Sequence, residues 1–499
     1  MSILLALDAG TSSCRTVAFD LDGNIKVVSQ QEFQQHYPRP GWVEHDATEI
    51  RDVQLQTMTD VLGQLGTAAG DVCGIGVSNQ RETVVVWDRR TGMPIHRAIV
   101  WQDRRTAAEV ARLAEAADVR DLVRDRTGLV MDPYFSASKL RWILDHVEGA
   151  RAAADAGHLA FGTIECWLLW SLTRGRTHAT DASNAARTML FDISKQCWDD
   201  ELLRLFDIPP SILPEVVDCA GRFGEIEGGS GLEVTGLIGD QQSALFGQGG
   251  LSRGDAKTTY GTGCFLLMNT GDQPARSTQG LLSTVAWRLN GVPTWALEGS
   301  VFMGGASIQW LRDGLGIINT APDVNALAGS VDDSDGVILV PAFAGLGAPY
   351  WDAWGRAAIL GMTRGTTAAH IARATLEGIA LSVRDVLHAM EADSGITLQE
   401  LRVDGGAAAS DLLMQIQADV LDSAVLRPAM LETTAWGAAS MAGIGCGVYA
   451  SAVDAAGHWH LDRRFEPAVD AAKRDRTLRT WARAVDSVRG WAKEDGDAS

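Results

Sequence analysis

The chain has 499 residues, of which 46% are hydrophobic and 21% are charged, and its formal net charge at pH 7 is -20. One hydrophobic core rarely serves so long a chain, so we expect a globular protein of two or three domains. The excess of acidic residues argues against sequence-independent binding to a nucleic-acid backbone, which requires clustered lysine and arginine.

No segment of the sequence predicts export or a membrane span. The apolar run at residues 3–7 is too short for a signal peptide, and no stretch reaches ~18 uninterrupted apolar residues. The seven cysteines are scattered, and no two have the C-x-x-C spacing. We therefore expect reduced thiols in the cytoplasm rather than a disulfide framework or a zinc site.

The first predicted element is a strand over residues 3–7, followed by a polar turn and a returning strand over residues 14–19. The turn suits a phosphate group, because Gly10 lets backbone approach a ligand and its neighbours supply hydroxyl, N–H and cationic groups. These neighbours are Thr11, Ser12, Ser13 and Arg15. Asp8 is a candidate for holding a hydrated Mg²⁺. An ordinary β-hairpin with a polar loop explains the same residues equally well.

A second polar cluster follows a predicted strand over residues 72–77, where Arg81 and Glu82 are adjacent opposite charges. A guanidinium donates hydrogen bonds and a carboxylate accepts them, so the pair could bind vicinal hydroxyl groups. The competing interpretation is a surface ion pair of little energetic value. Trp101 and Tyr134 could wall a small polar ligand, although an aromatic residue is more often part of a core.

Helices are predicted over residues 140–147, 150–156 and 163–172 from their apolar spacing and composition. The following stretch, residues 181–187, is predicted to be a polar turn, and its sequence indicates no role.

Asp240 lies at a predicted strand-to-helix turn. An apolar run over residues 234–238 predicts a short buried strand, Gly239 makes the turn, and residues 241–248 begin a helix. Ligands of α/β proteins bind outside the carboxyl ends of such strands. We therefore expect Asp240 to accept a proton from a substrate hydroxyl, with an N-cap carboxylate as the competing interpretation.

The pattern of strand, Gly/Thr turn and strand recurs at residues 256–271, about half a chain after its first appearance. This recurrence indicates duplication of one α/β domain, with the glycine-rich residues 247–254 as a hinge. Two such turns could grip a polyphosphate from opposite sides. Glycine pairs before a predicted helix at residues 307–311 and at residues 405–406 would let a base or ribose lie close to backbone. The sequence contains neither a P-loop nor a complete G-x-G-x-x-G fingerprint.

Several segments, in order over nearly the whole chain, resemble the FGGY family of carbohydrate kinases, and within it the members that phosphorylate glycerol. Two of them are the family signatures, at residues 134–142 and 357–377. The others are Gly41-Trp-Val-Glu-His-Asp46, Asn79-Gln-Arg-Glu-Thr83, Trp101-Gln-Asp-Arg-Arg-Thr106, Asp132-Pro-Tyr-Phe135, Gly239-Asp-Gln-Gln242, Thr259-Tyr-Gly-Thr-Gly-Cys-Phe265 and Ala306-Ser-Ile-Gln-Trp-Leu-Arg-Asp313.

The resemblance implies an α/β fold of two duplicated actin-like (ribonuclease H-like) ATPase domains, over residues 1–250 and 251–499, with the active site in the cleft between them. It implies transfer of the γ-phosphoryl group of ATP to glycerol, giving sn-glycerol 3-phosphate, with Mg²⁺. It also implies a cytoplasmic homo-oligomer, a dimer or tetramer, that neither binds nucleic acid nor inserts into a membrane.

The resemblance assigns roles to individual residues. The implied general base is Asp240, and the implied hydroxyl-binding set is Arg81, Glu82, Tyr134, Asp240 and Gln241. Trp101 and Phe265 form the implied apolar wall. Thr11, Ser12, Ser13 and Arg15 fall on the first phosphate turn, and Thr262 falls on the second. The implied nucleotide side consists of Gly305, Gln309, Gly406 and Ser410, the last standing where many members have asparagine. Asp8 matches the family's metal-linked aspartate.

Two expectations concern regulation. Some bacterial members are inhibited by fructose 1,6-bisphosphate through a loop that carries arginine, whereas residues 226–235 here form a shorter segment without arginine or lysine. We therefore predict weak or absent control by that sugar. No histidine occurs between His178 and His370, so activation by phosphorylation of a histidine in this region is not expected.

Two other functions compete with glycerol phosphorylation. One is phosphorylation of another small polyol or a ketose, because pocket volume cannot be read from sequence. The other is a non-catalytic actin-like ATPase that serves as a scaffold, which would have no need for Arg81, Glu82 and Asp240 together.

Overall fold

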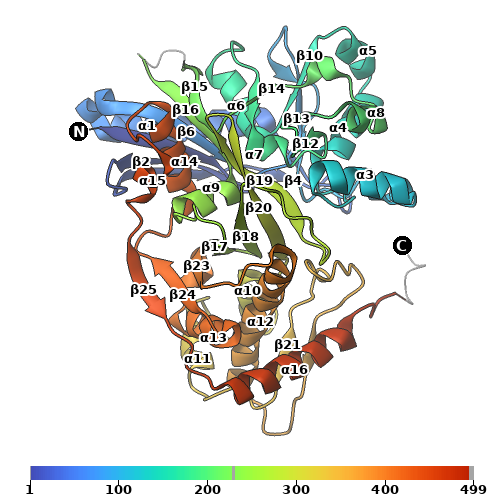
Figure 1. Ribbon diagram of the computed structural model, residues 1–499, viewed down its shortest axis with the longest axis vertical. Helices are drawn as coiled ribbons and strands as arrows, with labels where there is room; N and C mark the ends of the chain where they lie inside the picture. Colours follow the sequence, from blue (N-terminus) through green and yellow to red (C-terminus); the bar gives the residue numbers. More distant parts are fainter. Residues whose placement is uncertain (1, 227–230, 494–499) are drawn as a thin grey trace.

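The computed structural model describes residues 2–226 and 231–493 of the chain. It contains two large β-sheets, the first in the upper part of Figure 1 and the second below it. In spatial order, the first consists of β15 (Ala220–Glu225), β16 (Glu233–Gly239), β6 (Val72–Asn79), β1 (Ile3–Ala9), β2 (Ser13–Asp20) and β3 (Ile25–Glu32). The second consists of β19 (Leu282–Leu289), β20 (Val292–Val301), β18 (Cys264–Gly271), β17 (Ala256–Tyr260), β23 (Glu400–Asp404), β24 (Ala424–Pro428) and β25 (Leu461–Phe465).

The two sheets share one pattern of strand pairing. In the first, β1 pairs antiparallel with β2, β2 antiparallel with β3, and β1 and β16 both pair parallel with β6. In the second, β17 pairs antiparallel with β18, β18 antiparallel with β20, and β17 and β24 both pair parallel with β23. The predicted α/β fold with a duplicated unit is therefore confirmed.

Helices cover both faces of the first sheet. On one face lie α1 (Ala47–Leu65) and α6 (Ile164–Leu172), and on the other lie α9 (Asp240–Gly247) and α14 (Thr433–Gly445). Successive side chains of a strand point to opposite faces, so Leu5 of β1 packs with α1 and α6 while Leu4 packs with α14. With both faces covered, β1 is buried along its whole length.

Helix α14 belongs to the second half of the chain but packs on the sheet of the first half (Figure 1). Glycines permit the close approach: a Cβ atom on Gly76 of β6 would lie 1.9 Å from the carbonyl oxygen of Ala438. Between α9 and α14, a Cβ on Gly437 would lie 1.9 Å from the carbonyl oxygen of Ser243. The helix that begins at Asp240 is thus braced by a segment almost 200 residues away, and the predicted division at residue 250 stays a prediction.

The remaining elements of the first half form a smaller unit beside the first sheet. Its strands are β4 (Gln35–His36), β5 (Glu44–His45), β7 (Val85–Asp88), β8 (Met93–Pro94), β9 (Ala98–Ile99), β10 (Leu159–Gly162), β11 (Ala179–Asp181), β12 (Phe191–Asp192), β13 (Cys197–Trp198) and β14 (Glu215–Val217). Its helices are α2 (Ala107–Leu113), α3 (Ala117–Thr127), α4 (Ser136–His146), α5 (Ala150–Asp155), α7 (Ala182–Ala185) and α8 (Asp200–Leu205), and the 3₁₀ helices of this half are η1 (Gly66–Asp71) and η2 (Pro210–Ile212).

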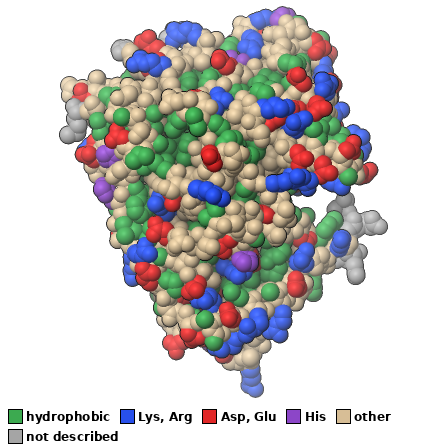
Figure 2. Space-filling model, viewed as in Figure 1, with side chains coloured by type: hydrophobic (Ala, Val, Ile, Leu, Met, Phe, Trp, Pro, Cys, Tyr) green, Lys and Arg blue, Asp and Glu red, His purple; other side chains and the backbone are tan. Residues whose placement is uncertain are grey.

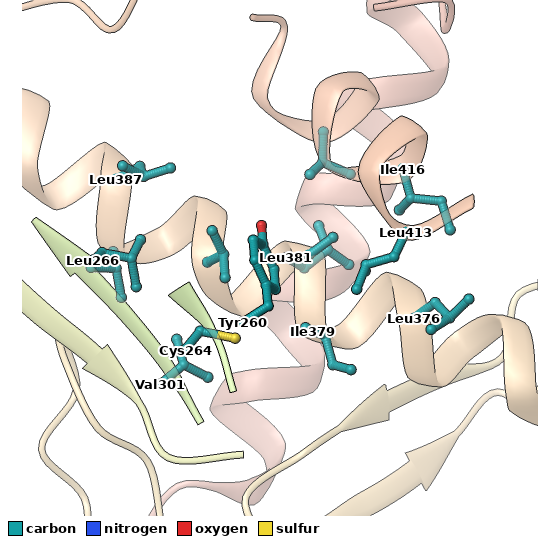
Figure 3. Packing of buried hydrophobic residues seen from close by; sticks show 14 of the residues in the cluster. Tyr260, Cys264, Leu266, Val301, Leu376, Ile379, Leu381, Leu387, Leu413 and Ile416 are labelled. Atoms are coloured by element: carbon teal, nitrogen blue, oxygen red, sulfur yellow. The ribbon is translucent and has the colours of Figure 1, made fainter. Parts of the chain in front are cut away.

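The second sheet packs against a long central helix. Figure 3 shows Tyr260 beside Ile379 and Leu381 of α12, Leu266 near Leu387 of the same helix, and Leu413 of α13 next to Leu381. The elements of this half outside the large sheet are α10 (Gly305–Asp313), α11 (Asp323–Ala328), α12 (Ala368–Ser394), α13 (Asp411–Leu421), α15 (Ala452–Ala456), α16 (Ala471–Val488), η3 (Gly406–Ala409), β21 (Ile338–Val340) and β22 (Ala358–Leu360).

The prediction of a polar turn at residues 181–187 is wrong. Asp181 ends β11, residues 182–185 form α7 and only residues 186–187 lie in a turn, while the polar side chains of the segment are buried with hydrogen-bond partners inside the protein. Asp181 accepts from the backbone N–H of Ser183, and Asn184 exchanges two amide hydrogen bonds with Asn79, both of 3.0 Å. Polar composition alone predicted exposure, whereas mutual pairing allows burial.

Two observations concern the surface. Among the described residues, no helix is long and apolar enough to cross a membrane. Figure 2 shows acidic and basic side chains interspersed over one face of the molecule.

Of the segment considered for sugar bisphosphate control, residues 227–230 lie outside the described part of the chain.

Candidate active site

The strands β1, β6 and β16 end at the same edge of the first sheet. Their registers pair Ala9 with Asn79 and Asn79 with Gly239, so the segments that follow the three strands lie side by side. The first of these segments is the Gly/Thr turn, the second carries Arg81 and Glu82, and the third begins with Asp240. Parallel pairing therefore brings together three motifs that are about 70 and 160 residues apart in the sequence.

Asp240 is the first residue of α9, and its carboxylate faces Arg81. The Nε atom of Arg81 lies 3.0 Å from Oδ1, which also accepts from the backbone N–H of Gln241 at 2.7 Å. The side chain is 31% exposed, so a ligand can reach it. Burial raises its pKa above the usual range, although Arg81 opposes the shift. The N-cap interpretation is wrong, because Gly239 occupies the N-cap position.

Arg81 and Glu82 are buried, which rules out the surface ion pair. Each side chain is 2% exposed. Arg81 donates to Glu298 through Nη1 and Nη2, at 2.5 and 3.0 Å, and to Gln242 through Nη1 at 3.1 Å. These bonds use three of the five guanidinium N–H groups, both on Nη1 and one on Nη2, while Nε lies in ion-pair contact with Asp240. One N–H on Nη2 therefore remains for a ligand hydroxyl.

Glu82 has a left-handed backbone conformation, with φ of 61°. Such a conformation costs roughly 1–3 kcal/mol in a residue other than glycine, and it persists where the surroundings enforce it. Here Arg187 donates from Nε to the Glu82 carboxylate at 2.6 Å, and the Ser136 hydroxyl donates to the Glu82 carbonyl at 2.9 Å. The strained residue is Glu82, whose carboxylate is expected to accept a hydrogen bond from a substrate hydroxyl.

The predicted aromatic wall is brought together from three parts of the chain. The ring of Trp101 lies edge-on to the rings of Tyr134 and Phe265, with centroid distances of 5.6 and 6.4 Å. The indole Nε1 donates to the Thr11 hydroxyl at 3.0 Å, which places the wall next to the first phosphate turn.

The two turns predicted to bind phosphate are the corresponding turns of the duplicated sheets. Ser12 and Thr262 are exposed at their tips, while Thr11 and Ser13 are half-buried. In the second turn, the N–H of Gly305 donates to the carbonyl of Gly261 at 2.8 Å, the same atom that a Cβ on Gly305 would approach to 2.8 Å. The absence of a side chain lets α10 begin directly against the turn.

Arg15, the cation predicted for the first turn, contacts two carboxylates. Its Nη2 donates to Oδ2 of Asp8 at 2.7 Å, and its Nη1 contacts Glu432. Both contacts compete with a phosphate for the same guanidinium.

The residues predicted for the nucleotide side lie along the second sheet and its helices. Gln309 is exposed on α10, and Gly406 is exposed after the carboxyl end of β23. Ser410 is the N-cap of α13: its hydroxyl accepts from the Leu413 N–H at 3.1 Å and donates to Asn325. Its side chain is thus already engaged within the protein, and a contact to a nucleotide stays a prediction.

Sequence reasoning missed three charged residues at this site: Arg187, Lys257 and Glu298. Lys257 lies on β17 with its side chain fully buried, and its Nζ donates to Gln241 Oε1 at 2.5 Å and to the Thr259 hydroxyl at 2.8 Å. Arg187 and Glu298 join the two sides of the site. A single charge within a strand was the available signal for Lys257 and Glu298, since burying a charge requires a partner.

Both halves of the chain match models of one protein family. Residues 3–247 match the N-terminal domain of the FGGY family of carbohydrate kinases, and residues 256–446 match its C-terminal domain. A glycerol kinase of Aromatoleum aromaticum is 56% identical over 494 residues, covering 98% of this chain and 99% of that protein.

Solved structures give the same result. The crystal structure of Plasmodium falciparum glycerol kinase with ADP has a TM-score of 0.91 and 34% identity, covering 98% of each chain. A ligand-bound xylulose kinase from Lactobacillus acidophilus, 20% identical with a TM-score of 0.88, shares the fold over 99% of each chain. The chain therefore belongs to the FGGY family of carbohydrate kinases.

Proposed function

We propose that the protein transfers the γ-phosphoryl group of ATP to glycerol and forms sn-glycerol 3-phosphate. Relatives named glycerol kinase at 53–56% identity over nearly the full chain support this substrate. The observation that carries the chemistry is the partly exposed Asp240 carboxylate, 3.0 Å from the Arg81 guanidinium at the shared edge of three strands.

Asp240 acts as the general base. Its carboxylate accepts the proton of the attacking hydroxyl, and a raised pKa favours this role at neutral pH. Arg81 donates to a hydroxyl through its remaining N–H, and Glu82 accepts from a neighbouring one. Tyr134 and Gln241 complete the polar set, while the rings of Trp101 and Phe265 cover the carbon chain.

The two Gly/Thr turns hold the phosphates between the sheets. The groups that support this assignment are Thr11, Ser12, Ser13, Arg15 and Thr262, with Gly305, Gln309, Gly406 and Ser410 on the nucleotide side. We propose the boundary between the two domains at residue 250, between the segments that match the two family models. A cytoplasmic location and a dimeric or tetrameric state also remain predictions, which fractionation and light scattering would test.

Asp8 is the residue that would hold Mg²⁺. It fits because one of its oxygens accepts from Arg15, while the other has no donor among the described residues, and Mg²⁺ binds readily to one carboxylate plus waters and phosphate oxygens. When bound, Mg²⁺ neutralises charge on the β- and γ-phosphates.

An ATP-dependent assay of the purified protein against glycerol and four- and five-carbon polyols tests the substrate. We expect the highest kcat/KM with glycerol, and a larger polyol or a ketose that exceeds it would reassign the specificity. Asp240→Asn should lower kcat by about 10²–10⁴-fold while ADP still binds. Asp155→Asn, which changes an exposed carboxylate of α5, is the matched control and should leave kcat unchanged. Full activity in Asp240→Asn would exclude the proposed base.

A further inference from the structure

Glu298 connects the second sheet to the substrate side of the first. It lies on β20, and its carboxylate accepts from both Nη atoms of Arg81. The oxygen Oε1 also accepts from Nη2 of Arg187 at 2.9 Å. The side chain is 2% exposed, so these bonds are shielded from water.

Arg187 completes the connection on the other side. Its Nη2 contacts Glu298, and its Nε donates to Glu82 at 2.6 Å. The guanidinium is fully buried and lies 5.6 Å from the centroid of the Tyr134 ring. The result is a continuous line of alternating charges that runs from Asp240 through Arg81, Glu298 and Arg187 to Glu82.

We propose that Glu298 and Arg187 are positioning residues for the polyol site: together they hold Arg81 and Glu82 in the orientation in which the two side chains bind neighbouring hydroxyl groups. The inference rests on the proposed function, because it assigns the support of the same site. It also gives a role to residues 181–187, whose sequence indicated none.

The arrangement exceeds what stability requires. Replacing a buried ion network by apolar side chains of similar volume is often neutral or stabilising. Arg187 also keeps a buried Nη1 without a hydrogen-bond partner among the described residues, which is unfavourable for a purely structural side chain. The geometry does serve a function: Arg187 holds the carboxylate of Glu82, and Glu298 fixes the plane of the Arg81 guanidinium through both Nη atoms.

Glu298→Gln tests the support of Arg81, because it keeps the shape of the side chain and removes its charge. We expect kcat/KM for glycerol to fall by about thirtyfold or more, mainly through KM, as for loss of one partner of a buried charge pair. The KM for ATP and the affinity for ADP should change less than twofold, because Glu298 does not lie at the phosphate turns. Gln399→Glu, which changes an exposed side chain just before β23, is the control and should leave the kinetic constants unchanged.

Arg187→Met and Arg187→Lys test the support of Glu82 through a pH profile. The charged and titratable groups that face Glu82 are Arg81, Arg187, Glu298, Tyr134 and Lys139. Burial raises the pKa of Glu82, and Arg187 is the strongest opposing influence. Without that cation, the pKa of Glu82 should rise further, and the protonated carboxyl group would present an O–H donor where the substrate hydroxyl needs an acceptor. We expect the acid limb of the kcat/KM profile for glycerol to lie at higher pH in Arg187→Met than in the natural protein, and Arg187→Lys to restore most of the activity at pH 7.

A structural role alone would lower the melting temperature without changing the pH profile or the ratio of the two KM values. Unchanged KM for glycerol in Glu298→Gln, or the same pH profile in Arg187→Met and the natural protein, would overturn the inference. If the natural protein fails to phosphorylate glycerol at all, the proposed function fails instead, and this result is obtained before any variant is made.

Discussion

Lys257 is expected to lower the free energy of unfolding while it supports activity, and both effects can be measured. Its side chain is fully buried, and burial lowers the pKa of the ammonium group from 10.5 to about 8. Asp404 and Asp240 oppose the shift without cancelling it. At pH 7 the folded protein therefore carries a buried cation that the unfolded chain would carry in water.

The sign and size of the effect follow from linkage. The pKa of Lys257 is lower in the folded state than in the unfolded state. Neutral Lys257 therefore carries no charge-burial cost above pH 10.5, and this advantage for the free energy of unfolding is lost as the pH falls through about 8. Each pH unit between the two pKa values corresponds to about 1.4 kcal/mol, which gives about 3 kcal/mol in total. That amount is the cost of keeping Lys257 protonated at pH 7.

Lys257→Met removes this cost together with two short hydrogen bonds, to Gln241 and Thr259, and a long one of 3.5 Å to the Phe265 carbonyl. At about 1 kcal/mol for each of the two short bonds and little for the long one, the variant should unfold with a free energy about 1 kcal/mol higher than the natural protein at pH 7. At pH 10.5, where the natural protein has largely escaped the penalty, the variant should be less stable by about 1–2 kcal/mol. Denaturant unfolding at both pH values measures the difference.

The same substitution should reduce activity. Lys257 orients the amide of Gln241, which we propose as a hydroxyl ligand, so we expect kcat/KM for glycerol to fall about tenfold or more. Lys195→Met, which changes an exposed lysine, is the control and should alter neither quantity by much. A stability difference that is the same at pH 7 and pH 10.5 would refute the reasoning about the buried charge.

Three further predictions concern the phosphate turn, the helix contact and the base. Glu432→Gln should lower the KM for ATP about two- to fivefold, because Arg15 loses a half-exposed competitor for phosphate; an unchanged KM would contradict this. Gly437→Ala should lower the free energy of unfolding by about 1–3 kcal/mol, since its Cβ would lie 1.9 Å from a carbonyl oxygen of α9, whereas Gly63→Ala in α1, with open space around it, should not destabilise. The profile of kcat/KM should fall with decreasing pH as the raised pKa of Asp240 is crossed, and the same acid limb in Asp240→Asn would assign it to another group.

The local features of the site could be predicted from sequence. Alternating and apolar runs predicted the strands before Asp8, Arg81 and Asp240, and glycines marked the turns that follow or precede them. These signals span fewer than about ten residues each, which is the range over which strand periodicity and turn chemistry act. The recurrence of the hairpin after half a chain was visible for the same reason, because both copies obey the same local rules.

Only the tertiary structure decided which groups meet and which are buried. Arg81 contacts Glu298 across 217 positions of sequence, and Arg187 contacts Glu82 across 105. No local pattern encodes such pairs, since they follow from the parallel order of β1, β6 and β16 and from the place of Glu298 on β20 of the other sheet. The misjudged segment at residues 181–187 shows the same limit: its composition is polar, but its burial depends on partners supplied by distant strands.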